Sequence, residues 1–401
     1  MDVDIVAWLG LALRWFHLML GIMWIGASFY FVWLDLALRP PKDKADKAAG
    51  VSGEVWAVHG GGFYHKKKYL VAPEGMPEDL HWFKWEAYLT FISGFLLLCL
   101  LYYFNADQYL IDPAKMPLKP LQATLIGLAF IGGGWVFYDV LCKSPLGDNV
   151  KVFSAIWAAA LVFSAYALCE IFTGRGAFIH VGAMIGTAMT ANVFAVIIPN
   201  QKKVVKALLA GEKPEAKYGK IAKQRSMHNN YMTLPVLLIM ISNHYPVIYS
   251  GDYNWLILSG LGLASWPFRH FFNLKDKGIT DYRFATVGVA GYIFVMLAAS
   301  GLFVTERPVT AAQTVTPAEV RQIVRTHCSA CHSDTPVSPT VSVAPGGVMF
   351  DTMEEIKKHA PRIIERAVTS DAMPLGNETR MTDEERKKLG AGLEALKPEG
   401  K

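Results

Sequence analysis

Long apolar stretches separated by polar segments dominate the first three quarters of the chain. Eight of them are about 20 residues long, the length that an α-helix needs to cross the hydrocarbon core of a membrane. Aromatic residues collect at their ends, as is typical of membrane interfaces. The pattern predicts eight transmembrane helices, at residues 15–36, 86–104, 120–141, 152–172, 176–199, 230–250, 253–272 and 284–304.

The segments between these helices differ sharply in charge. Those that follow the first, third, fifth and seventh helices contain 21 Lys and Arg residues, whereas the alternate segments contain three. Positively charged loops stay in the cytoplasm, so we expect a multi-pass protein of the bacterial cytoplasmic (inner) membrane with both termini in the periplasm. Residues 39–85 are expected to form a turn-rich cytoplasmic insertion. Residues 200–229 are expected to form a short basic amphipathic helix on anionic membrane lipid.

Composition separates the tail from the rest of the chain. Charged residues make up only 18% of the sequence, but from Thr305 onward there are 13 Lys and Arg and 14 Asp and Glu. Soluble domains carry about 25% charged residues, so the tail is expected to fold in water. We therefore predict a transmembrane domain at 1–305, a linker at 306–316 and a periplasmic domain at 317–401.

The tail contains the motif CSACH, in which Cys328, Cys331 and His332 lie within one turn. Two thiols three positions apart can bond to the two vinyl groups of one haem, and the following histidine then ligates the iron. A zinc ribbon would need a second pair of cysteine ligands, and the tail contains no further cysteine. A redox dithiol would need a βαβ context, whereas the flanking sequence is helical. The motif therefore predicts covalently attached haem c.

The second axial ligand is expected from a loop ahead of the last helix. Met373 lies in the segment SDAMPLGN, 41 residues after His332, and a thioether ligand raises the iron potential. Met349, Met353 and Met381 are its competitors. The fold expected is all-α: a polytopic bundle of eight transmembrane helices followed by a small class I-like cytochrome c domain.

Ionisable residues inside spanning helices are costly and commonly functional. The predicted topology places them in two layers. The cytoplasmic layer, with one loop histidine, could bind a flat anionic heterocycle and accept its proton; it comprises Glu86, His228, Asn230, Arg269, His270 and His59. The periplasmic layer offers an alternative substrate site or ligands for a b-type haem, and comprises Arg14, His17, His180 and His244.

The sequence resembles the bacterial membrane-bound urate oxidases (urate hydroxylases) that carry a fused C-terminal cytochrome c domain. The resemblance covers essentially the whole chain. It rests on HLMLGIMWIGASFYF (17–31), VHGGGFYHKKKY (58–69), LHWFKWEAY (80–88), SMHNNYMTLPVLLIMISNHYP (226–246) and CSACH (328–332).

The resemblance implies oxidation of urate to 5-hydroxyisourate. Electrons would pass to the protein's own haem c, then to a periplasmic cytochrome or terminal oxidase of the respiratory chain. We expect no nucleic-acid partner. A cytoplasmic substrate site would need an intermediate carrier such as a b-type haem, because the hydrocarbon core is about 30 Å thick. The alternatives are an oxidoreductase linked to quinol or another small molecule, and a non-catalytic electron-transfer subunit of a larger oxidase.

Overall fold

The computed structural model describes residues 5–73, 75–251, 253–301, 315–338, 341, 343–370, 372–377 and 379–396. Most of the predicted linker, residues 306–314, lies outside the described residues, as do residues 302–304 of the eighth predicted helix.

Every predicted apolar window falls largely on a helix. The helices of this part are α1 (Ile5–Ala37), α2 (Lys44–Ala48), α3 (Trp85–Leu98), α4 (Ala106–Tyr109), α5 (Pro120–Lys143), α6 (Val150–Ile171), α7 (Gly174–Ala191), α8 (Ile198–Leu209), α9 (Ala216–Ser242), α10 (Pro246–Tyr249), α11 (Asn254–Asp276) and α12 (Tyr282–Gly301). A π-helical segment, Cys99–Tyr103, extends α3, and another, Asn192–Ile197, joins α7 to α8. A 3₁₀ turn, Pro145–Asp148, follows α5.

Six helical stretches among the described residues are long and apolar enough to cross a membrane. They are Trp8–Ala37, Trp85–Tyr103, Pro120–Lys143, Val150–Ile171, Gly174–Leu209 and Tyr282–Ala299. Helices α9 and α11 are also long, with 27 and 23 residues, but both bury polar side chains and contain a proline. Because α9 packs against both α7 and α11, its polar residues face protein, which explains its low hydropathy.

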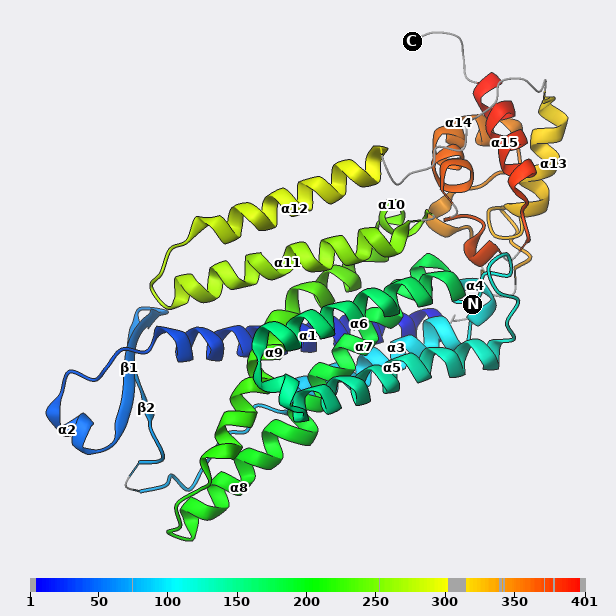
Figure 1. Ribbon diagram of the computed structural model, residues 1–401. Coiled ribbons are helices and arrows are strands. Elements are labelled where there is room, and N and C mark those ends of the chain that lie inside the picture. The colour runs from blue at the N-terminus through cyan, green and yellow to red at the C-terminus, as the bar shows by residue number, and fades with distance from the viewer. Residues whose placement is uncertain are drawn as a thin grey trace.

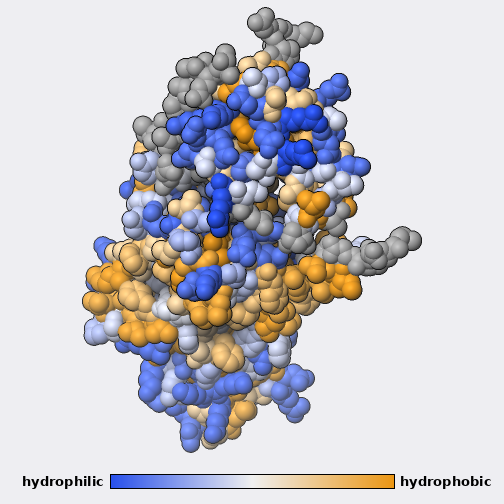
Figure 2. All heavy atoms as spheres, turned by 90° about the vertical axis from the view of Figure 1, so that its right-hand side faces the viewer, coloured by the Kyte–Doolittle hydropathy of each residue, from blue (hydrophilic) through white to orange (hydrophobic). Residues whose placement is uncertain are grey.

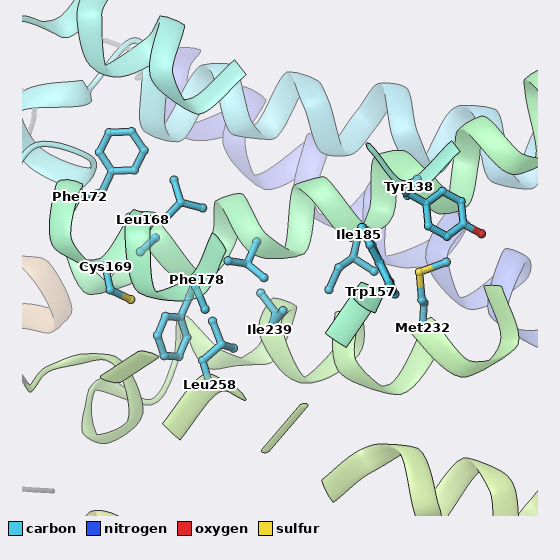
Figure 3. Packing of buried hydrophobic residues seen from close by; sticks show 14 of the residues in the cluster. Tyr138, Trp157, Leu168, Cys169, Phe172, Phe178, Ile185, Met232, Ile239 and Leu258 are labelled. Atoms are coloured by element: carbon cyan, nitrogen blue, oxygen red, sulfur yellow. The ribbon is translucent and has the colours of Figure 1, made fainter. Parts of the chain in front are cut away.

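Helix α7 lies at the centre of the bundle. It packs against α3, α5, α6 and α9, while α12 lies along α11 on one side (Figure 1). The main apolar core gathers side chains from α6, α7, α9 and α11, among them Leu168, Phe178, Ile239 and Leu258 (Figure 3). The remaining helices surround this core.

The outward faces of the surrounding helices are apolar. On α1, for example, Trp15 is 72% exposed and Leu18 62% exposed, and on α12 Phe294 is 64% exposed. Figure 2 looks onto the end that carries the C-terminal domain and shows hydrophobic residues along both sides of the helical part below it. Contiguous exposed apolar surface of this kind is typical of contact with lipid.

Two glycines of the bundle allow close helix packing. A Cβ at Gly134 would lie 2.2 Å from the Met184 sulfur, and one at Gly182 would lie 2.6 Å from Ile239. Gly132, Gly133 and Gly186 face open space and have no such role.

The prediction of an all-α chain is wrong at residues 51–69. Strands β1 (Val51–His59) and β2 (Gly62–Tyr69) form an antiparallel hairpin, with Trp56 opposite His65 and Glu54 opposite Lys67. Gly60 and Gly61, both at positive φ, form the turn. The β-branched and aromatic residues along VWAVH and FYHKK, on either side of consecutive glycines, could have indicated this hairpin.

Residues 200–229 do not form a separate amphipathic helix on the membrane surface. Helix α8 continues the π-helical end of α7 as far as Leu209, and α9 begins at Ala216. The segment therefore consists of extensions of two bundle helices joined by a short connection. Arg225, counted above as a loop charge, is buried.

The tail folds as a small helical domain with its own core. Its helices are α13 (Pro317–His327), α14 (Met353–Ile363) and α15 (Asp383–Ala395), with a π-helical segment Ile364–Thr369 and 3₁₀ turns at Pro345–Gly347 and Leu375–Asn377. Val324, Ile356, Val368 and Leu389 form the centre of the core. The domain lies at the end of the bundle where α1 begins, opposite the β-hairpin and α8 (Figure 1).

Candidate functional site

Helix α13 leads directly into the segment that carries the cysteine pair. Its N-terminus is closed by a capping box in which Thr316 and Glu319 each bond the other's backbone N–H. The helix ends at His327, directly before Cys328, and the His332 N–H donates to the Cys328 carbonyl oxygen at 2.9 Å. Cys328, Cys331 and His332 therefore share one turn, as predicted.

The His332 ring is held from one side. Its Nδ1 lies 2.9 Å from the Val348 carbonyl oxygen, and its centroid is 4.9 Å from that of Phe350. A hydrogen bond of this kind sets the tautomer and leaves Nε2 available to a metal. The arrangement fits a histidine that ligates haem iron.

Met373 packs against the same apolar core as Cys328. Its backbone is fixed on both sides: the Met373 N–H donates to the Arg366 carbonyl at 2.8 Å, and Arg386 Nη1 donates to the Met373 carbonyl at 2.7 Å. Of its competitors, Met381 is almost fully buried in the core. Met373 is thus partly buried and anchored through its backbone, and its role as an axial ligand stays a prediction.

The geometry supports neither of the two alternatives for the cysteine pair, a zinc ribbon and a redox dithiol. Within the described residues, no group of three or more His, Cys, Asp or Glu side chains is placed to hold a metal ion. Burial raises the pKa of the Cys328 thiol to about 12, whereas reactive dithiols have lowered pKa values.

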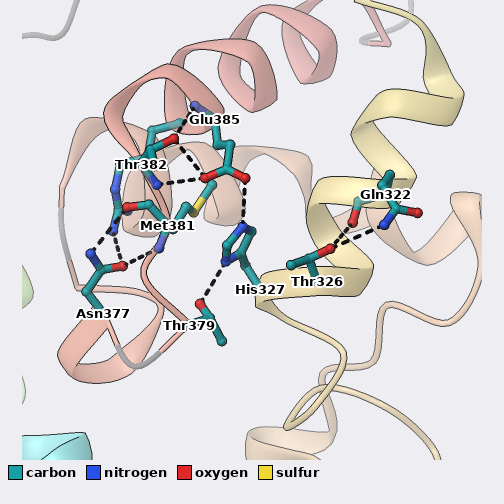
Figure 4. Close-up of polar contacts among 9 residues, drawn as sticks. Gln322, Thr326, His327, Asn377, Thr379, Met381, Thr382 and Glu385 are labelled. Atoms are coloured by element: carbon teal, nitrogen blue, oxygen red, sulfur yellow. Dashed lines mark hydrogen bonds and ion pairs between the residues drawn. The ribbon is translucent and has the colours of Figure 1, made fainter.

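A polar cluster beside the cysteines was not predicted. His327 contacts Thr379 Oγ1 through Nδ1 at 2.8 Å and Glu385 Oε1 through Nε2 at 3.2 Å (Figure 4). Glu385 also closes the capping box of α15 with Thr382, and the backbone N–H of Thr382 is the main cause that lowers the Glu385 pKa. The spacing of Thr382 and Glu385 ahead of the last helix was a readable signal.

In the helical bundle, only Asn230 and Arg269 of the predicted cytoplasmic layer touch each other. Arg269 Nε donates to Asn230 Oδ1 at 2.5 Å, and Asn230 Nδ2 donates to Asn273 Oδ1 at 3.0 Å. The Arg269 guanidinium lies 3.9 Å from the Phe29 ring centroid. All three polar side chains are buried.

The other members of the predicted cytoplasmic layer lie apart from one another. His228 Nδ1 contacts the Tyr138 hydroxyl at 2.9 Å and its ring stacks on Phe153, whereas His270 Nδ1 contacts the Tyr231 hydroxyl at 2.7 Å. Glu86 lies in the first turn of α3 and His59 at the exposed end of β1. The six predicted residues therefore do not form one pocket.

A partly buried ion pair of the bundle was also missed. Arg225 donates to Asp139 at 2.9 Å and to Asn192 Oδ1 at 3.1 Å, and Asn192 in turn donates to Tyr138 and Asn229. Asn192 opens the π-helical segment after α7, and such segments often occur at functional sites. This network links α5, α7 and α9.

The periplasmic-layer histidines lie on different elements. His17 Nδ1 is 3.0 Å from the Thr90 carbonyl oxygen, between α1 and α3. Both ring nitrogens of His180 are occupied, by the Gly176 carbonyl at 2.7 Å and the Tyr103 hydroxyl at 3.2 Å. His244 and Arg14 are exposed. At His180 the ring is enclosed by Tyr102, Tyr103 and Phe172, so its surroundings do not fit a porphyrin.

Comparison with known proteins identifies the helical bundle. Searches among curated proteins and among solved structures gave no match. The family model described as "Urate oxidase N-terminal" matches residues 3–300, which cover the described helices from α1 to α11, the β-hairpin and α12 up to its penultimate residue. The chain therefore belongs to the urate oxidase N-terminal family.

Proposed function

We propose that the protein oxidises urate to 5-hydroxyisourate and passes the electrons to a haem c attached to its own C-terminal domain. The family membership supports urate as the substrate and oxidation as the reaction. The single observation that carries the electron route is the shared turn of Cys328, Cys331 and His332, with His332 Nδ1 tied to Val348.

Each residue of the haem site has a defined task in this proposal. Cys328 and Cys331 would hold the group covalently, His332 would offer Nε2 to the iron, and Met373 would offer its thioether. A bound haem c would supply a one-electron acceptor. Arg386 and the core around Leu389 keep the Met373 loop in place.

We also propose that all eight long helical elements span the inner membrane: α1, α3, α5, α6, α7 with α8, α9, α11 and α12. The start of α1 and the C-terminal domain lie at one end of the bundle (Figure 1), as an even number of crossings requires. The opposite end carries the lysine-rich β2 and α8. By the positive-inside rule that end is cytoplasmic, so the haem domain is periplasmic and delivers electrons to a respiratory partner there.

The test uses membranes that contain the full-length protein. Urate is added to the oxidised sample, and the haem absorption bands are recorded. Reduction by urate, with 5-hydroxyisourate as product, is the expected result. Reduction by quinol only would favour the quinol-linked alternative. Reduction only after addition of other subunits would favour a non-catalytic electron-transfer role.

A further inference from the structure

A cleft separates the C-terminal domain from the end of the helical bundle. Its volume is about 790 Å³, within the range of small-molecule sites. One wall comes from α4, the start of α7 and the residues around α10; the other comes from the loop between Met373 and α15. The 3₁₀ turn Leu375–Asn377 lies against α4, which joins the two walls (Figure 1).

Two guanidinium groups face this cleft from opposite walls. Arg175 comes from the first turn of α7 and Arg380 from the C-terminal domain. Among the described residues, neither is paired with a carboxylate. By contrast, the Lys115 ammonium, also in the cleft, is already held by the carbonyl oxygens of Cys169 and Phe172. The cleft therefore offers two guanidinium groups that are not paired with a carboxylate, and the carboxylates of Asp112, Glu170 and Asp383 also line it.

Arg175 is positioned by its surroundings. Its guanidinium lies 5.1 Å from the Tyr109 ring centroid and 6.0 Å from that of Tyr102. Its Nε donates to Asn243 Oδ1 at 3.3 Å, and its guanidinium also interacts with the side chain of Tyr102. Arginine in this setting suits a planar anion that accepts two parallel hydrogen bonds.

The cleft also contains polar groups without a full set of partners. The Ser250 hydroxyl oxygen is buried and has no hydrogen-bond partner among the described residues. Asn254 uses its Nδ2 on the Tyr249 carbonyl at 2.8 Å, so its amide oxygen remains to accept. A buried hydroxyl without a partner is costly and rare in native structures.

The backbone conformation of Arg380, on the opposite wall of the cleft, also favours a ligand site. Arg380 has φ +55°, in the left-handed region that a non-glycine side chain rarely adopts. Residues held there are concentrated at ligand sites, where the surroundings maintain the strain.

The cleft adjoins the Met373 loop. Arg386, which lines the cleft, donates to the carbonyl oxygens of both Met373 and Ala367. A molecule in the cleft would thus lie one side chain from the loop of the proposed axial ligand. A site at Arg269 would instead require electrons to cross most of the membrane, about 30 Å of hydrocarbon.

We propose that this cleft binds the planar urate monoanion, with Arg175 and Arg380 as its charge partners and Ser250 and Asn254 at its edge. The inference rests on the proposed function and places the urate site outside the membrane. In the half-reaction, urate monoanion and one water give 5-hydroxyisourate, one proton and two electrons. The electrons leave singly to the proposed haem c, and the proton leaves to the adjoining solvent.

The test uses the full-length protein and two readouts. Binding of labelled urate is measured by equilibrium dialysis, and the KM for urate is measured from haem reduction. Arg175→Gln and Arg380→Gln should each weaken binding and raise KM at least about tenfold, because each removes a charge-assisted hydrogen bond. Haem content and reduction by ascorbate should stay unchanged. Lys119→Gln and Arg321→Gln serve as matched controls, since both residues are exposed and lie outside the cleft.

The outcomes separate this inference from the proposed function. A wild-type protein that neither binds urate nor is reduced by it overturns the proposed function. A wild-type protein that responds to urate, with both cleft variants indistinguishable from it, overturns the cleft. Loss of urate binding in Arg269→Gln but not in the cleft variants would place the substrate in the cytoplasmic layer instead.

Discussion

Arg386 Nη1 lies 2.7 Å from the carbonyl oxygen of Met373. This contact joins the last helix of the chain to the loop that carries the proposed axial ligand. The same guanidinium reaches the Ala367 carbonyl at 2.6 Å and Asn377 Oδ1 at 3.3 Å, so one buried side chain holds three points of the loop and its neighbour. The position of Met373 is therefore set by backbone anchoring rather than by burial.

The first prediction compares two methionines of that domain. Met373→Ala should lower the haem reduction potential and remove the absorption band of thioether-ligated iron, because a thioether favours ferrous iron. Met381→Ala should leave the potential unchanged but cost about 2–5 kcal/mol of stability, since Met381 is a core residue. Redox titration and thermal unfolding measure the two effects. An unchanged potential in Met373→Ala would transfer the ligand role to another residue.

The second prediction concerns covalent attachment. The double variant Cys328→Ala/Cys331→Ala should carry no covalent haem while the helical bundle still inserts into the membrane. Denaturing gels stained for haem peroxidase activity are the measurement. Cys169→Ala, which changes a buried cysteine of the bundle, should keep its stained band. A stained band in the double variant would contradict the assignment.

The third prediction concerns pH. The pKa of Glu385 is lowered in the folded domain, first by the Thr382 N–H and also by His327. Stabilisation of the fold by the ionised Glu385 carboxylate should therefore be complete above the ordinary glutamate pKa of about 4.3. It should disappear as the pH falls through the lower pKa of Glu385 in the folded state. Glu385→Gln should unfold at a lower temperature than wild type near pH 6, and the difference should shrink below about pH 4.

The size of that effect follows from the capping box. Loss of one such cap costs about 1 kcal/mol. Lys357→Gln, a change at a residue exposed on α14, is the matched control. A difference between Glu385→Gln and wild type that does not depend on pH would show that the carboxylate charge has no part in it.

The fourth prediction tests helix packing. A Cβ at Gly127 would lie 2.5 Å from His180 Nε2 and 3.2 Å from the Tyr103 hydroxyl, whereas Gly133 on the same helix has nothing within 4 Å. Gly127→Ala should lower the thermal stability of the purified protein by about 1–3 kcal/mol, as expected of overpacking. Gly133→Ala should be neutral or slightly stabilising. Equal effects of the two variants would contradict the packing of α5 against α7.

The fifth prediction concerns topology. In intact spheroplasts, a membrane-impermeant lysine reagent should label Lys357 and Lys387 of the C-terminal domain. It should spare the lysines of β2 and α8 until the membrane is opened. The opposite pattern would reverse the proposed orientation.

The sequence by itself determined the local features. Apolar stretches of membrane length located the helices, because a helix in lipid must satisfy its own backbone hydrogen bonds. The CSACH spacing placed three functional groups on one turn, because neighbours in sequence are necessarily close in space.

Only the tertiary structure decided which distant residues meet. The predicted cytoplasmic layer sorted residues by depth in the membrane, but depth says nothing about the direction in which each helix face points. Hence Asn230 and Arg269 meet, while His228 and His270 turn to different neighbours. The burial of Arg225 against Asp139 and the opposition of Arg175 and Arg380 across one cleft arise from how separate elements pack. Pairing of this kind depends on long-range packing, which hydrophobic periodicity along one chain does not encode.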